Sequence, residues 1–120
     1  MTRPQRNLIS GPVSARLMLA AYTALIAYLA LRPSVATGGL PGLDKVLHAG
    51  AFAVMALLAV WALGAARIAA ACAGAFMVGL LIEAGQHALP YGRDASLGDI
   101  AANGLGCAAA AFAAKVWAPR

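Results

Sequence analysis

Charged residues are scarce in this chain. Of its 120 residues, 9 are Lys or Arg and 4 are Asp or Glu, so charged residues make up 11% of the sequence. A soluble domain carries about 25% charged residues, whereas here hydrophobic residues reach 62% and the mean hydropathy is +0.80. These values exclude an ordinary soluble domain and indicate an integral membrane protein.

Other absences limit the kinds of reaction and binding that the sequence supports. The two cysteines, Cys72 and Cys107, lie in apolar segments, which indicates small packing residues rather than a disulfide framework or a metal site. The sequence has no CxxC, HExxH, Gly-x-Ser-x-Gly or P-loop motif, so the usual nucleophilic, zinc and nucleotide chemistries lack support. The net charge of +5 comes from single basic residues near the ends of apolar segments, so we expect no nucleic-acid partner.

Long apolar runs are what the sequence does contain. Four of them, at about 14–31, 44–63, 67–87 and 96–117, approach the roughly 20 residues that cross a bilayer core. Gly- and Pro-rich stretches or very short turns separate them. We therefore predict an all-α membrane protein, a compact antiparallel bundle of four transmembrane helices over residues 14–118, after a polar N-terminal tail at 1–13.

A competing interpretation makes the first apolar run a cleaved signal peptide, with residues 34–36 as a small-residue cleavage site. The run is long for such a signal, and Arg32-Pro33 would intrude before the cleavage site, so we favour a membrane span.

The basic residues predict an orientation, because cytoplasmic flanks carry an excess of Lys and Arg. With the N-terminus inside, the cytoplasmic set is Arg3, Arg6, Arg16, Arg67, Lys115 and Arg120, and the outer set is Arg32, Lys45 and Arg93. Both termini are then cytoplasmic. The polar side chains at the start of the second and fourth runs and at the end of the third meet at the outer end of the bundle.

The first two polar clusters are at 44–48 and 83–87. Asp44 and His48 are four residues apart and share a helix face, so Asp44 can orient the imidazole or simply serve as the helix N-cap. Glu83, Gln86 and His87 also share a face. An ionisable group within a membrane is costly and needs a reason, and the alternative to a functional role for Glu83 is an interhelical hydrogen bond.

The third cluster opens the fourth run with Arg93, Asp94, Ser96, Asp99 and Asn103. Ser96 and Asp99 fit a capping-box-like helix start, and the Arg93 guanidinium suits a carboxylate or a phosphate. A metal site formed by residues of the three clusters is an alternative interpretation. No established metal-binding signature is present, so we assign no metal and no cofactor. That alternative site comprises His48, His87, Glu83 and Asp99.

Together these residues resemble the VanZ-like family of small bacterial membrane proteins. The pattern is D-K-x-x-H from Asp44, E-x-x-Q from Glu83, and R-x-x-S-x-x-D-x-x-x-N-G from Arg93, over residues 44–104. His87 is not part of it. The resemblance implies a multi-span protein of the bacterial inner membrane and cell envelope, in a family named after an accessory protein of glycopeptide resistance, without implying resistance or a settled reaction.

Two functional hypotheses follow. The first is a site at the outer face that binds or modifies an amphipathic envelope lipid or lipid-linked glycan. The second is a non-catalytic scaffold whose polar network fixes helix packing and docks a membrane-protein partner or a second copy. A transport pathway is disfavoured, because the inner halves of the spans are almost purely apolar. Under the first hypothesis the acid–base or orienting residues are His48, Glu83 and Asp99, and the binding residues are Lys45, Arg93, Gln86, Asn103, Asp44 and Ser96.

Overall fold

A computed structural model of the chain describes residues 11–32, 42–89 and 96–117. In these ranges the chain forms four long α-helices and no strand: α1 (Val13–Leu31), α2 (Leu43–Leu63), α3 (Ile68–Ala88) and α4 (Leu97–Trp117), with a 3-10 turn, η1 (Ala65–Arg67), between α2 and α3. The expected spans differ from these helix bounds by at most one residue at either end. The predicted all-α bundle is confirmed.

Each helix is long and apolar enough to cross a membrane. A helix of 21 residues, such as α2, is about 31 Å long, which matches the hydrocarbon thickness of a bilayer. Large apolar side chains on the outside of the bundle are exposed, for example Leu17, Leu81, Leu105 and Phe112. Such a surface suits lipid rather than water, so the fold fits a multi-pass membrane protein.

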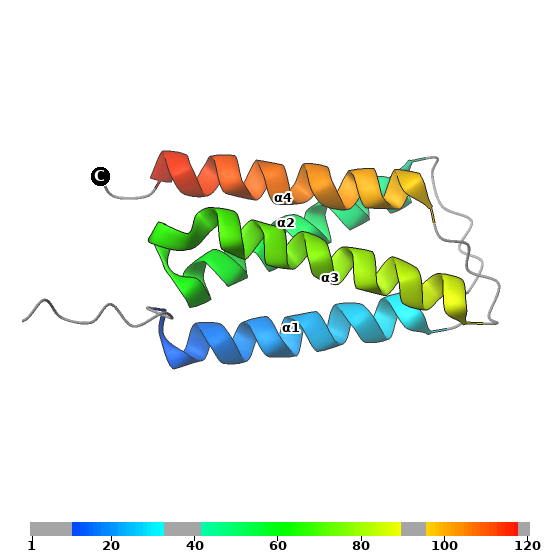
Figure 1. The fold of residues 1–120 in the computed structure, drawn as a ribbon, viewed down its shortest axis with the longest axis horizontal. Coiled ribbons are helices and arrows are strands. Elements are labelled where there is room, and N and C mark those ends of the chain that lie inside the picture. Colours follow the sequence, from blue (N-terminus) through cyan, green and yellow to red (C-terminus); the bar gives the residue numbers. More distant parts are fainter. Residues whose placement is uncertain (1–10, 33–41, 90–95, 118–120) are drawn as a thin grey trace, which may run out of the picture.

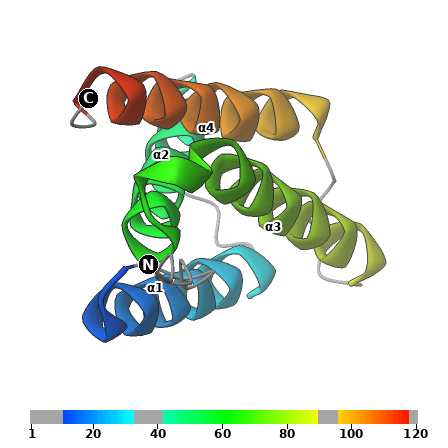
Figure 2. The same cartoon turned by 60° about the vertical axis from the view of Figure 1, so that its left-hand side comes forward.

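The helices run alternately up and down, so α2 and α4 are parallel to each other (Figure 1). In both views α1 and α4 lie on opposite sides of the bundle, with α2 and α3 between them (Figures 1 and 2). Helix α1 is peripheral, since Ala15 is its only buried residue, whereas α2, α3 and α4 share the core around Phe52, Met55 and Ile82.

Close packing of α2 on α4 depends on Gly106. A Cβ atom at this position would overlap the carbonyl oxygen of Ala49 and lie 3.0 Å from the backbone nitrogen of Ala53. Ala102 and Ala110, one turn to either side of it, are buried. Small residues allow membrane helices to approach each other closely, so this contact fixes how near the first turns of α2 and α4 lie.

The start of α2 differs from expectation. The prediction that Asp44 caps this helix is wrong, because the helix begins at Leu43 and its N-cap is Gly42, at φ 81° and without a side-chain cap. Glycine adopts this left-handed conformation without steric cost. Asp44 therefore lies in the first turn, and its carboxylate is available for contacts within the polar cluster.

Candidate functional site

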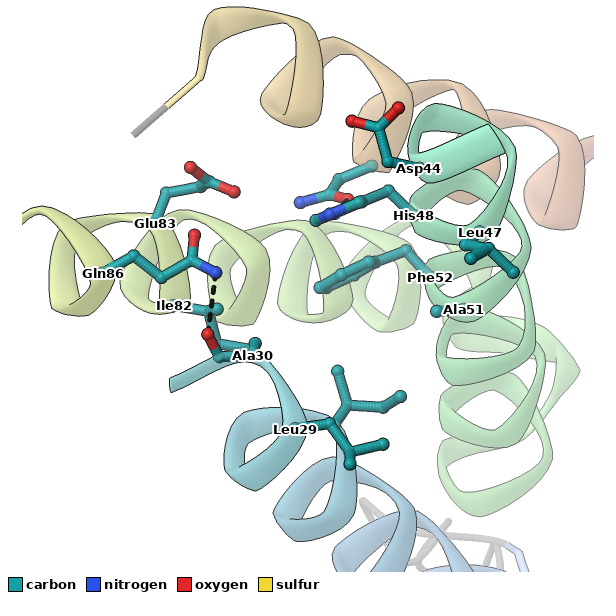
Figure 3. Close-up of a pocket in the computed structure, with 12 residues that line it drawn as sticks. Leu29, Ala30, Asp44, Leu47, His48, Ala51, Phe52, Ile82, Glu83 and Gln86 are labelled. Atoms are coloured by element: carbon teal, nitrogen blue, oxygen red, sulfur yellow. Dashed lines mark hydrogen bonds between the residues drawn. The ribbon is translucent and has the colours of Figure 1, made fainter. Parts of the chain in front are cut away.

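The predicted polar residues meet at the end of the bundle where α2 and α4 begin and where α1 and α3 end (Figures 1 and 3). Hydrogen bonds, ion pairs or a shared cavity connect eight of the nine predicted site residues: Asp44, Lys45, His48, Glu83, Gln86, Ser96, Asp99 and Asn103. Arg93 and its neighbour Asp94 lie outside the described residues. His87 is exposed and does not take part in these contacts among the described residues.

Lys45 joins α2 to α4. Its Nζ atom lies 2.5 Å from Oδ1 of Asp99 and 2.8 Å from Oδ2 of Asp44. The Asp99 side chain is 14% exposed and that of Asp44 is 64% exposed, so the pair with Asp99 is the more shielded one. Because two carboxylates already neutralise this ammonium group, little of its charge remains for a phosphate ligand.

His48 makes the second contact between α2 and α4. Its Nδ1 atom lies 3.2 Å from Oδ1 of Asn103. An amide oxygen only accepts hydrogen bonds, so Nδ1 carries the proton and, in the neutral ring, Nε2 keeps its lone pair. Nε2 lies 3.8 Å from Oδ2 of Asp99, which is too long for a hydrogen bond.

Glu83 reaches from α3 to the start of α4. Its residue is only 2% exposed, and its Oε2 atom accepts the backbone N–H of Ser96 at 3.2 Å. The other carboxylate oxygen, Oε1, is buried without a hydrogen-bond partner among the described residues. A buried acceptor left unpaired costs roughly 1–3 kcal/mol of stability, so Oε1 lacks the hydrogen-bond partner that its burial calls for.

The start of α4 has one of the two hydrogen bonds of a capping box. The hydroxyl of Ser96 accepts the backbone N–H of Asp99 at 3.3 Å. In the full motif the third residue would in return accept the N–H of the capping residue. Here Glu83 accepts that N–H. The Asp99 carboxylate is thereby free to contact Lys45 and to face His48.

Gln86 ties α3 to α1. Its Nε2 atom donates to the carbonyl oxygen of Ala30 at 2.9 Å (Figure 3). Ala30 lies in the last turn of α1, where carbonyl groups have no partner within the helix. This contact closes one side of the site and gives Gln86 a packing role.

A cavity of about 300 Å³ adjoins the polar cluster. Glu83 and His48 face each other across it, and α1 forms the opposite, apolar wall (Figure 3). Its volume is at the lower end of the range for small-molecule pockets, about 300–1,000 Å³. The lining residues are Ile26, Leu29, Ala30, Asp44, Leu47, His48, Ala51, Phe52, Ile82, Glu83, Gln86 and Asn103.

Sequence reasoning missed the contribution of α1. Ile26 and Leu29 line the cavity, and the hydroxyl of Tyr22 donates to the carbonyl oxygen of Ala51 on α2 at 2.7 Å. In a run of Ala, Leu and Ile no local signal distinguishes cavity-lining side chains from lipid-facing ones. The Tyr22 hydroxyl was the one available sign, because a tyrosine hydroxyl within an apolar run usually needs a hydrogen-bond partner.

Comparisons with protein families, with curated proteins and with solved structures find no match for this chain.

Proposed function

We propose that this protein binds an amphipathic envelope lipid or lipid-linked glycan in the cavity between α1, α2 and α3. The observation that carries the proposal is the two-sided lining of the cavity. Leu29 and Ile26 offer an apolar wall, while Glu83 offers a buried carboxylate and His48 a half-buried imidazole at the membrane-surface end of the bundle. An acyl chain suits the first surface and a polar headgroup the second.

Unpaired acceptors predominate on the polar side. Oε1 of Glu83 has no partner among the described residues, Nε2 of His48 keeps its lone pair, and the ammonium of Lys45 is paired with carboxylates. The site therefore favours a headgroup that donates hydrogen bonds, such as a sugar or glycerol hydroxyl, over a phosphate. The same groups suit acid–base chemistry on a bound hydroxyl, with Nε2 of His48 as the base and Asn103, which accepts the Nδ1–H, as the group that orients the ring.

The proposed location is the outer leaflet of the bacterial inner membrane, with both termini cytoplasmic. Arg16 in the first turn of α1, Arg67 in η1 and Lys115 in the last turn of α4 lie at the end opposite to the cavity. An excess of basic residues on one side is typical of the cytoplasmic face. The resemblance of residues 44–104 to the VanZ-like family agrees with an envelope protein.

Filling the cavity tests the lipid proposal. Ala51 lines it, so Ala51→Phe introduces a ring into space that the lipid would occupy. The control is Ala73→Phe on α3, because Ala73 is exposed on the outer surface of the bundle. Lipids that stay bound to the purified protein are identified and counted by native mass spectrometry.

We expect the Ala51→Phe protein to lose a specifically bound lipid while keeping its helical circular dichroism and melting temperature, and the control protein to retain that lipid. Equal retention by both proteins, or no bound lipid in the unmodified protein, would refute the proposal.

A scaffold role is the second candidate. It is favoured by contacts that tie three helices together: Lys45–Asp99 and His48–Asn103 join α2 to α4, and Glu83–Ser96 joins α3 to α4. In such a scaffold the polar network fixes helix register for docking a membrane-protein partner or a second copy. His48→Ala and Glu83→Gln would then lower protein accumulation and melting temperature together, whereas a ligand role predicts lost binding in proteins that still accumulate.

A further inference from the structure

We infer that His48, Glu83 and Asp99 form a binding site for a divalent transition-metal ion at the polar end of the cavity. The three residues come from three different helices, α2, α3 and α4. One potential ligand atom from each lies within 4.8 Å of the others. The inferred ion shares His48 and Glu83 with the polar end of the proposed lipid site, and the inference does not depend on lipid binding.

Three acceptor atoms of these residues carry the inference. Oε1 of Glu83 is buried without a hydrogen-bond partner among the described residues. Nε2 of His48 and Oδ2 of Asp99 face each other at 3.8 Å, and in the neutral histidine neither atom carries a hydrogen. A cation between these atoms would satisfy all three, whereas a hydroxyl donor would satisfy one of them.

The local charge points to an ion of charge +2. Asp44, Glu83 and Asp99 bring three negative charges in their ionised forms, and Lys45 brings one positive charge through its pairs with Asp44 and Asp99. The described cluster therefore has a formal charge of −2. Uncompensated charge is expensive near a membrane interior, and a divalent cation would balance it.

The second polar atom of each proposed ligand is already held by a neighbour. Metal ligands are characteristically oriented in this way by outer partners, which fix the histidine tautomer and the carboxylate direction. The three contacts are Nδ1 of His48 with Asn103, Oδ1 of Asp99 with Lys45, and Oε2 of Glu83 with the backbone N–H of Ser96.

The donor set selects the class of ion. One imidazole nitrogen and two carboxylate oxygens suit Zn²⁺ or Mn²⁺ better than Mg²⁺ or Ca²⁺, which prefer all-oxygen sites. Bonds of about 2.0–2.2 Å place ligand atoms about 3.5 Å from one another, so ion binding would draw these three side chains closer together than the 4.8 Å within which they lie. Three protein ligands leave a coordination position for water or for a headgroup hydroxyl.

The test uses the full chain, purified in detergent, freed of any affinity tag, stripped with a chelator and titrated with Zn²⁺ or Mn²⁺. Calorimetry measures the stoichiometry, and the melting temperature is recorded with and without each ion. We expect one ion per chain and a higher melting temperature with metal. Glu83→Gln, which keeps an oxygen for the Ser96 N–H, should weaken binding at least about 10-fold and lose the metal-dependent shift.

Two further variants keep the test decisive. His48→Gln removes a ligand without changing a carboxylate, so it should also lose the shift even if the Glu83 variant fails to fold. His87→Ala is the matched control, because His87 is exposed and outside the cluster, and it should bind as the unmodified protein does. Absence of saturable binding, or loss of binding only in the His87 variant, overturns the inference.

The outcomes separate this inference from the lipid proposal. Metal titrations use lipid-depleted protein, and the lipid assay is repeated with chelator present. The Ala51→Phe protein should lose lipid and keep metal binding, since Ala51 is not among the proposed ligands. If the protein retains lipid but binds no metal, only the cation site is refuted. If it binds metal but retains no lipid, only the lipid proposal is refuted.

Discussion

Replacing Gly106 with alanine tests whether close packing of α2 on α4 builds the polar site. The added Cβ would overlap the carbonyl oxygen of Ala49. That oxygen belongs to the helix backbone, so it cannot move aside as a side chain would. The helices must separate, and the contacts Lys45–Asp99 and His48–Asn103 one to two turns away must lengthen.

The magnitude follows from two opposing effects. Overpacking of a well-packed contact costs about 1–3 kcal/mol, and alanine gains roughly 0.5–1 kcal/mol over glycine within a helix. We therefore expect a net loss of up to about 2.5 kcal/mol in the free energy of unfolding. Gly50→Ala is the matched control, since a Cβ at Gly50 has no atom within 4 Å. It should leave the protein as stable or slightly more stable.

The assay is reversible unfolding in mixed micelles with increasing denaturing detergent, followed by circular dichroism. A second measurement is retention of the bound lipid, which the Gly106→Ala protein should lose in part and the Gly50→Ala protein should keep. If the two variants are equally stable, the close contact at Gly106 does not exist as described and the reasoning fails.

Three other predictions concern α1, the start of α4 and the membrane orientation. Tyr22→Phe removes the hydrogen bond to the Ala51 carbonyl and should cost about 0.5–1.5 kcal/mol in the same unfolding assay, with no change in helical content; a neutral result would mean that α1 is held by apolar packing alone. Ser96→Ala removes the N-cap bond to the Asp99 N–H and should cost about 0.5–2 kcal/mol, compared with Ser14→Ala on the exposed face of α1. Reporter enzymes fused after Arg120 should be active only if they work in the cytoplasm, and an exported fusion would invert the proposed orientation.

The fold was predictable because a bilayer imposes few solutions. Apolar runs of about 20 residues must form helices, since unpaired backbone groups are not tolerated in hydrocarbon. The short connection between α2 and α3 then makes them antiparallel neighbours. The meeting of the three polar clusters follows from the same alternation, because the starts of α2 and α4, near Asp44 and Ser96, and the last turns of α3, near Glu83, lie at one end of an up-and-down bundle.

The details of the site were less predictable because they depend on competition between partners. Asp44 is a good capping residue by type, yet Gly42 takes that position through its backbone conformation. Lys45 was expected to be a ligand-binding residue, and in the structure its ammonium group is paired with two carboxylates from within the chain. Neither outcome is visible in the residue spacing, since the first depends on the backbone conformation at Gly42 and the second on the approach of α2 to α4.

Glycine determines where long polar side chains can lie in this bundle. A Cβ at Gly79 would meet the Asn103 amide nitrogen at 2.9 Å and the Phe52 ring at 3.0 Å, and one at Gly98 would meet Cε of Lys45 at 2.9 Å. The space occupied by Asn103 and Lys45 is therefore the space that these two glycines leave empty. Polar side chains need both partners and room when water is excluded, so the small residues of α3 and α4 belong to the site as much as the groups that bear its chemistry.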